Sequence, residues 1–164
     1  VAIGSAGTAG HTHLGRCPIA REARYQAAIM RDGRILLIQH LEHATGRAYW
    51  VLPGGGLEEG ETELECVRRE VREETHLEVE VERLLLDEPS HVPEDMYKRL
   101  RTYLCRAVSG EPRPGYEPEP EAAAEYSIAA VGWWSIDDET TWDAGIADDP
   151  ITVHMLRRVR SAME

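Results

Sequence analysis

The chain has 164 residues, of which 42% are hydrophobic, and this length suits a single domain with a substantial core. It carries 18 basic and 30 acidic residues, and the resulting formal charge of −12 opposes non-specific binding to nucleic acid or to anionic membranes. No apolar run approaches the roughly 18 residues that a membrane helix needs, and residues 1–20 lack the pattern of a secretory signal. We therefore expect no membrane partner, no nucleic-acid partner and a cytoplasmic location.

Residues 1–20 are rich in Gly, Ala, Ser and Thr, and we predict a flexible N-terminal segment there, followed by a single domain over residues 21–164. His11 and His13 form a His-x-His pair, which in a glycine-rich segment is more often incidental than a metal site. The cysteines are isolated and odd in number, so reduced thiols are favoured over a disulfide framework; they are Cys17, Cys66 and Cys105.

Two apolar runs, residues 25–31 and 35–41, flank the dipeptide Asp32-Gly33. Asp-Gly between two apolar runs is a strong signal for a β-hairpin, because both residues tolerate the positive φ angles of a tight turn. A polar loop over residues 42–47 then leads into an aromatic segment and a run of three glycines, which allow the backbone to approach a ligand closely.

A helix is predicted to begin near Thr62. Thr62 and Glu65 have the spacing of a capping box, in which each side chain accepts a hydrogen bond from a backbone N–H at the helix start. Leu64, Val67 and Val71 recur at helical spacing, and we expect this stripe to pack on the core.

Three carboxylates, Glu70, Glu73 and Glu74, stand at positions i, i+3 and i+4 of this helix and therefore share one face. Like charges at this spacing repel one another, and a hard divalent cation such as Mg²⁺, which prefers carboxylate oxygens, would relieve the repulsion. A solvated acidic helix surface is the alternative, since glutamate is also a good helix former.

This segment resembles the Nudix box, G-x5-E-x7-R-E-U-x-E-E-x-G-U, where U is aliphatic. One position departs from the pattern: His76 stands where the family has glycine. Glycine there would occupy a left-handed conformation just past the helix end, and histidine is among the few other residues that adopt it without gross strain. The matching positions are Gly55, Glu61, Arg69, Glu70, Val71, Glu73, Glu74 and Leu77.

The resemblance implies an α/β (α+β) fold, a Nudix-like α/β/α sandwich with a mixed central sheet and the family's loop-helix-loop. It implies that Glu70, Glu73 and Glu74 are metal ligands and catalytic residues, and that the carbonyl of Gly55 is a further ligand. Glu61 and Arg69 are expected to pair and to support the loop against the helix. The resemblance leaves open whether the general base is Glu70, Glu73 or a glutamate from a loop.

A strand is predicted over residues 77–86, because apolar residues alternate there with charged ones, and a second strand is predicted over residues 97–108. The second strand contains Lys98, Arg99, Arg101 and Arg106, for which neutralisation of the acidic helix is favoured over contact with substrate phosphates. Residues 109–125, with four prolines and five glutamates, are predicted to be a long loop. Because Nudix enzymes often carry an additional acid at this place in the chain, Glu121 and Glu125 are the candidates.

Residues 131–138 resemble a late, tryptophan-containing strand of the family that leads into an acidic helix start. Asp149-Pro150 then predicts the start of a terminal amphipathic helix, since proline is well tolerated in a first helical turn.

Taken together, the resemblance implies Mg²⁺-dependent hydrolysis, by a Nudix pyrophosphohydrolase, of a nucleoside diphosphate linked to another moiety, such as a nucleotide sugar, ADP-ribose or a (d)NTP. Mn²⁺ is a substitute for Mg²⁺, and a homodimer is left open. Tyr49 and Trp50 are candidates for contact with the small-molecule nucleotide substrate. The alternative function is a non-catalytic Nudix-fold module that binds nucleotides, although such modules would normally lose carboxylates of the box.

Overall fold

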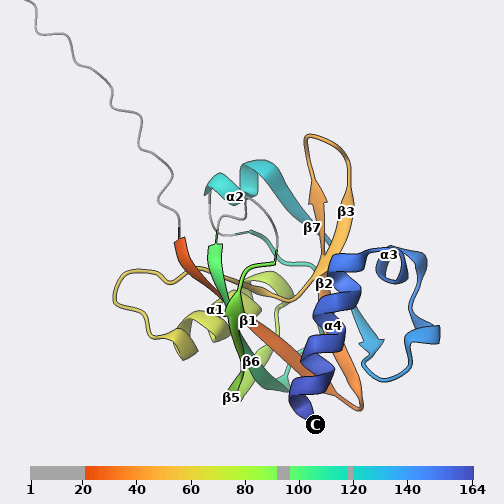
Figure 1. The fold of residues 1–164 in the computed structure, drawn as a ribbon. Coiled ribbons are helices and arrows are strands. Elements are labelled where there is room, and N and C mark those ends of the chain that lie inside the picture. Colours follow the sequence, from red (N-terminus) through yellow and green to blue (C-terminus); the bar gives the residue numbers. More distant parts are fainter. Residues whose placement is uncertain (1–20, 92–96, 118–119) are drawn as a thin grey trace, which may run out of the picture.

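The structure is a computed structural model, and it describes residues 21–91, 97–117 and 120–164 (Figure 1). The predictions of a flexible N-terminal segment, of an incidental His11/His13 pair and of a reduced Cys17 lie outside the described residues. Cys66 and Cys105 are buried free thiols, as predicted. No helix in the described ranges is long and apolar enough to cross a bilayer.

The Asp-Gly hairpin is present. Strands β1 (Arg21–Arg31) and β2 (Arg34–Glu42) pair antiparallel, with Met30 opposite Ile35. Asp32 and Gly33 form the turn with φ angles of 51° and 72°, the left-handed region that favours asparagine, aspartate and glycine.

The other strands are β3 (Ala48–Val51), β4 (Gly54–Gly55), β5 (Glu78–Pro89), β6 (Tyr97–Ser109) and β7 (Tyr126–Ser135). The strands of the described residues form one mixed sheet, in the order β3-β2-β1-β6-β5 with β4 paired to β1 and β7 paired to β2. The pairs β1/β2, β2/β3, β2/β7 and β5/β6 are antiparallel, whereas β1 and β6 run parallel.

Helices cover both faces of the sheet, which confirms the predicted α/β/α sandwich (Figure 1). Along β1, Ala27 and Ile29 point to the core under helix α1, while Ala28 between them points to the opposite core. This alternation is the two-residue period of a β-strand that is buried on both faces. The helices are α1 (Glu63–Thr75), α2 (Pro120–Glu125), α3 (Ala144–Ala147) and α4 (Pro150–Met163), with a short 3₁₀ turn, η1 (Glu139–Thr141).

Helix α4 begins as predicted, with Pro150 in its first turn and the Asp149 side chain accepting hydrogen bonds from the backbone N–H groups of Ile151 and Thr152. Its residues Leu156 and Val159 pack in the core opposite α1.

Two predictions about helices require correction. Leu64 does not belong to the buried stripe of α1, because it is 41% exposed; Cys66 is buried beside Val67 and Val71 instead. Residues 109–125 are not a loop throughout, since α2 occupies the last six of them. Alanines at positions 122–124 favour a helical turn there, and the prolines in the same window obscured that signal.

Three basic residues of β6 form ion pairs, the structural kind of role that was predicted, but their main partners lie on β5 rather than on the acidic helix. Arg99 and Arg101 both bind Asp87 of the neighbouring strand at 2.7 Å, and Arg101 also reaches Glu63 at the start of α1. Arg106 pairs with Glu80.

Candidate active site

Both ends of α1 are fixed by local interactions, which set where the helix begins and ends. At the start, Thr62 and Glu65 form the predicted capping box. At the end, His76 has φ 62° and ψ 13°, the left-handed conformation expected where the family pattern has glycine, and its N–H donates to the carbonyl of Arg72.

Glu70 and Glu74 are fully buried where α1 faces the glycine-rich strand β4. The backbone N–H of Gly54 donates to Glu74 Oε1 at 2.8 Å, and Arg69 Nη1 donates to Glu70 Oε1 at 2.9 Å. A Cβ atom on Gly55 would lie 2.3 Å from Glu70 Oε1, so the close approach of strand and carboxylate requires glycine at this position.

These two carboxyl groups lack sufficient partners for their charge. Burial, together with the nearby Glu74 carboxylate, raises the pKa of Glu70 to about 8. Burial likewise raises the pKa of Glu74 to about 8, an effect that Arg24 opposes and Glu117 reinforces. One oxygen of each, Oε2, is buried and has no hydrogen-bond partner among the described residues.

Arg69 connects the loop before α1 to the helix. Its guanidinium binds both oxygens of Glu61, at 2.7 and 2.9 Å, and also donates to the carbonyl of Gly56 at 3.1 Å. These hydrogen bonds lower the pKa of Glu61, which therefore stays ionised. A further bond of 3.1 Å to Glu73 holds the third carboxylate, whose side chain is 18% exposed.

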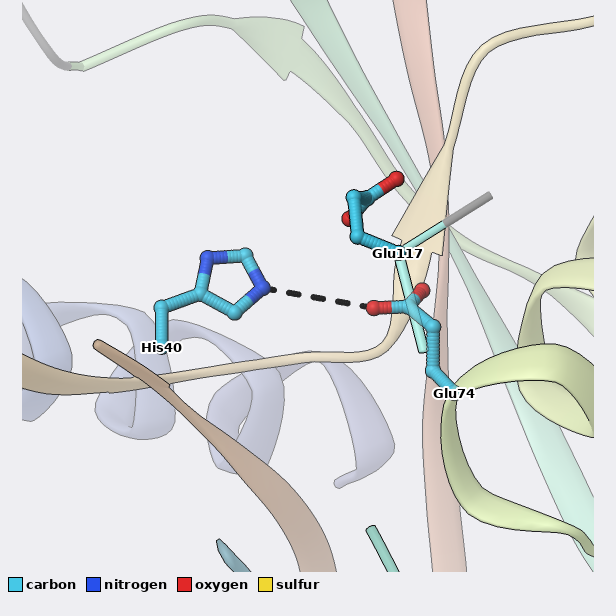
Figure 2. A group of neighbouring side chains, drawn as sticks. All are labelled: His40, Glu74 and Glu117. Atoms are coloured by element: carbon cyan, nitrogen blue, oxygen red, sulfur yellow. Dashed lines mark ion pairs between the residues drawn. The ribbon is translucent and has the colours of Figure 1, made fainter. Parts of the chain in front are cut away.

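Three residues that were not predicted as site residues lie near Glu74. His40 of β2 and Glu117 of the loop after β6 have ligand atoms within 4.8 Å of each other and of Glu74 (Figure 2). Arg24 of β1 donates a hydrogen bond to the carbonyl of Leu52. Burial lowers the pKa of Arg24, but the nearby Glu74, Tyr97 and Glu70 raise it, and the net pKa lies above the ordinary value. Because the three come from separate elements, no local pattern in the sequence joins them.

The loop over residues 110–117 is attached to the C-terminal turn of α1 by backbone hydrogen bonds. The N–H groups of Arg113, Gly115 and Tyr116 donate to the carbonyls of Thr75, Glu74 and Glu73 at 2.9 to 3.1 Å. These bonds satisfy helix carbonyls that have no partner within the helix, and they bring the next residue, Glu117, to the site.

Of the other predicted site residues, Tyr49 contacts the group through His40, whereas the remaining ones contribute no ligand atom to it. Glu121 and Glu125 are exposed, at the start and the end of α2. Tyr49 is half-buried against His40, with ring centroids 5.6 Å apart. Trp50 is only 7% exposed and packs edge-on against Trp134, so a role in stacking on a base would require its ring to leave the core.

This donor set fits a divalent cation. It offers buried carboxylate oxygens without hydrogen-bond donors, whose mutual repulsion a cation would cancel, and it is rich in the oxygen ligands that Mg²⁺ prefers. The buried thiol of Cys66 does not compete as a ligand, because burial raises its pKa to about 12.

Comparison with known proteins gives consistent matches. The family model described as NUDIX domain matches residues 22–154. A protein named NAD-capped RNA hydrolase NudC, from Photobacterium profundum, is 38% identical over 95 residues, which cover 58% of this chain and 34% of that protein. The chain thus spans about a third of the length of such curated relatives.

Solved structures agree with these sequence matches. An ADP-ribose pyrophosphatase from Streptococcus suis superposes with a TM-score of 0.61 at 26% identity, covering 87% of this chain and 92% of that one. A MutT NUDIX hydrolase from Burkholderia pseudomallei gives a TM-score of 0.56 at 32% identity, covering 85% and 98%. With the family model matching most of its length and the buried glutamates of the box arranged on α1, the chain belongs to the Nudix family.

Proposed function

We propose that this protein is a metal-dependent pyrophosphohydrolase that cleaves a nucleoside diphosphate linked to a second moiety. The observation that carries the proposal is the pair of fully buried carboxylates, Glu70 and Glu74, each with an oxygen that receives no hydrogen bond from the described residues. A domain that only binds nucleotides has no need of such a pair, which is costly to bury without a cation.

Glu70, Glu73, Glu74 and the carbonyl of Gly55 would hold Mg²⁺ in this proposal. When bound, the cation supplies charge neutralisation on the phosphate oxygens and lowers the pKa of a bound water. Arg69 keeps the loop and the helix in register, and the N–H of Gly54 orients Glu74. Glu73 has the most exposed side chain of the three carboxylates, which supports it as the group that takes the proton of the attacking water.

The bond changes are those of a hydrolysis. The water oxygen bonds to one phosphorus, the bridging P–O bond breaks, and the departing phosphate oxygen keeps the electron pair. The products from a dinucleotide or a nucleotide sugar are two phosphate monoesters, a nucleotide and the phosphate of the second moiety, whereas a dNTP cleaved between its α and β phosphates gives a nucleotide and pyrophosphate.

The names of the relatives suggest which compounds to test first. NAD and ADP-ribose, which appear in those names, both contain a diphosphate between adenosine and a second ribose. The formal charge of −12 favours free dinucleotides over capped RNA, because RNA would add a long polyanion.

A panel of NAD, ADP-ribose, nucleotide sugars, dNTPs and NAD-capped RNA tests the proposal, with release of phosphate monoesters measured in Mg²⁺ and in EDTA. We expect hydrolysis in Mg²⁺ only, and a loss of two orders of magnitude or more in kcat for Glu73→Gln and Glu74→Gln. Glu59→Gln, an exposed carboxylate of the same loop, is the matched control. Binding without turnover across the panel would instead favour the non-catalytic nucleotide-binding module.

A further inference from the structure

His40 is held in one orientation by its neighbours. Its ring stacks on Tyr126 at 5.4 Å and meets the edge of Tyr49 at 5.6 Å, and the residue is only 7% exposed. Its Nε2 atom is buried without a hydrogen-bond partner among the described residues. Burying a polar nitrogen in this way costs free energy, and an apolar ring would fill the same space without that cost.

The unpartnered nitrogen is aimed at carboxylates. Figure 2 shows Nε2 directed toward Glu74 Oε2, at 4.0 Å, with Glu117 on the same side. Two ligands of one first-row cation, at about 2.0 to 2.2 Å from it, lie about 3.0 to 4.4 Å apart. The His40–Glu74 distance falls in that range, and a carboxylate oxygen of the partly exposed Glu117 lies within 4.8 Å of both ligand atoms.

We propose that His40, Glu74 and Glu117 form a mixed nitrogen and oxygen site for a divalent transition metal, with Glu74 shared between this site and the carboxylates of Glu70 and Glu73. The inference rests on the proposed function, which it extends from an all-oxygen Mg²⁺ cluster to two adjacent sites with different ligands. Imidazole suits transition metals, whereas Mg²⁺ prefers oxygen. The His40 site therefore favours Mn²⁺, Co²⁺ or Zn²⁺ over Mg²⁺.

Mn²⁺ is the probe for this site, because its magnetic resonance spectrum reports both the amount bound and the ligating atoms. The full chain is freed of metal and loaded with one and then several equivalents of Mn²⁺, with and without a tenfold excess of Mg²⁺. We expect a directly coupled ¹⁴N nucleus in pulsed EPR, which persists in the excess of Mg²⁺.

Variants assign the nitrogen. His40→Gln should abolish the ¹⁴N coupling and weaken binding of the most tightly held Mn²⁺ by about tenfold or more, since even outer partners of metal ligands are worth 10–100-fold in affinity. His43→Gln is the matched control, because His43 lies only three residues further along the chain, in the turn after β2, and is exposed. A His11→Gln/His13→Gln double variant removes the His-x-His sequence and should retain the coupling.

The inference is overturned if the unaltered protein shows no ¹⁴N coupling, a result that does not depend on the folding of any variant. It is equally overturned if the coupling survives in His40→Gln. Hydrolysis of the diphosphate panel in Mg²⁺ alone is measured on the same preparation. Turnover without nitrogen coupling refutes only the His40 site, and coupling without turnover refutes only the proposed hydrolase.

Discussion

Glu70 and Glu74 lie one helical turn apart and are fully buried. Ionisation of these two carboxyl groups therefore lowers the stability of the metal-free protein. A carboxyl group whose pKa is raised on folding contributes stability that is complete below its unfolded pKa and is lost as pH rises toward the folded value. For Glu70 this window runs from about 4.5 to about 8.

The metal-free protein should lose stability as pH rises through this window. We predict that this loss is smaller in Glu70→Gln, because glutamine does not ionise. The measurement is the Tm in EDTA at a series of pH values from about 5 to about 9. Only the difference between variant and parent is interpreted, because His40 titrates too: burial and Arg24 lower its pKa to about 4. Parallel Tm profiles for the two proteins would refute the raised pKa of Glu70 in the metal-free protein, and Glu59→Gln should leave the profile unchanged.

His76 provides a second prediction at the scale of one residue. Its φ of 62° is the conformation that glycine adopts at no steric cost, so His76→Gly should stabilise the protein by about 1 kcal/mol or less. His76→Ala keeps a Cβ at the same backbone angle and should bring no such gain. Both are compared by chemical denaturation.

Kinetics separate this backbone role from recruitment of His76 to a substrate phosphate. The backbone role leaves kcat/KM unchanged in His76→Gly, whereas recruitment would lower it by tenfold or more. A variant that is both less stable and poorly active would show that our account of this departure from the box is wrong.

At the scale of elements, β4 approaches α1 closely enough that only glycine fits at position 55. We predict that Gly55→Ala weakens Mg²⁺ binding and lowers stability, because the added methyl group would lie 2.3 Å from Glu70 Oε1 and must displace that carboxylate. Calorimetry with Mg²⁺ and thermal unfolding measure the two effects.

A double variant tests the cause of this effect. Truncation of the facing side chain in Gly55→Ala/Glu70→Ala removes the clash, so its loss of stability should be smaller than the sum of the two single losses. Additive losses would mean that the added methyl group disturbs the backbone of β4 rather than the Glu70 side chain.

Elements whose signals are local were predictable from the sequence. The Asp32-Gly33 turn, the Thr62 cap and the Pro150 helix start each depend on a few adjacent residues, and each is present. The parallel pairing of β1 with β6 was not predictable in this way, because it joins residues such as Ala27 and Tyr103 that are far apart in the chain.

The same distinction applies to the site. The three glutamates of α1 are joined by helical periodicity, and Arg69 and Glu61 by the family pattern. His40 and Glu117 reach Glu74 only because β2, α1 and a loop meet in space. An acidic residue from the loop after β6 was expected, and Glu121 and Glu125 were the candidates. Glu117 lies only a few residues earlier in the chain, and the backbone hydrogen bonds between the loop and α1, which the sequence does not reveal, bring it close to Glu74.

At the scale of the whole molecule, the cation should contribute to folding stability. We predict that Tm rises with millimolar Mg²⁺, because the carboxylate array that binds the cation exists only in the folded state. The rise should be much smaller in Glu70→Gln than in Glu59→Gln. An unchanged Tm together with no heat of binding would count against a metal site on α1.

The attachment of residues 113–116 to the last turn of α1 has a consequence for how this enzyme family diverges. Glu117 is positioned by main-chain hydrogen bonds of the preceding residues. These bonds do not depend on the side chains, except that proline has no N–H and cannot replace a residue that donates one. Gly115 is the exception, since a Cβ there would meet the carbonyl oxygen of Glu73. Substitutions can therefore accumulate in this loop while the acid stays in place, whereas loss or gain of a single residue between Gly115 and Glu117 would remove it.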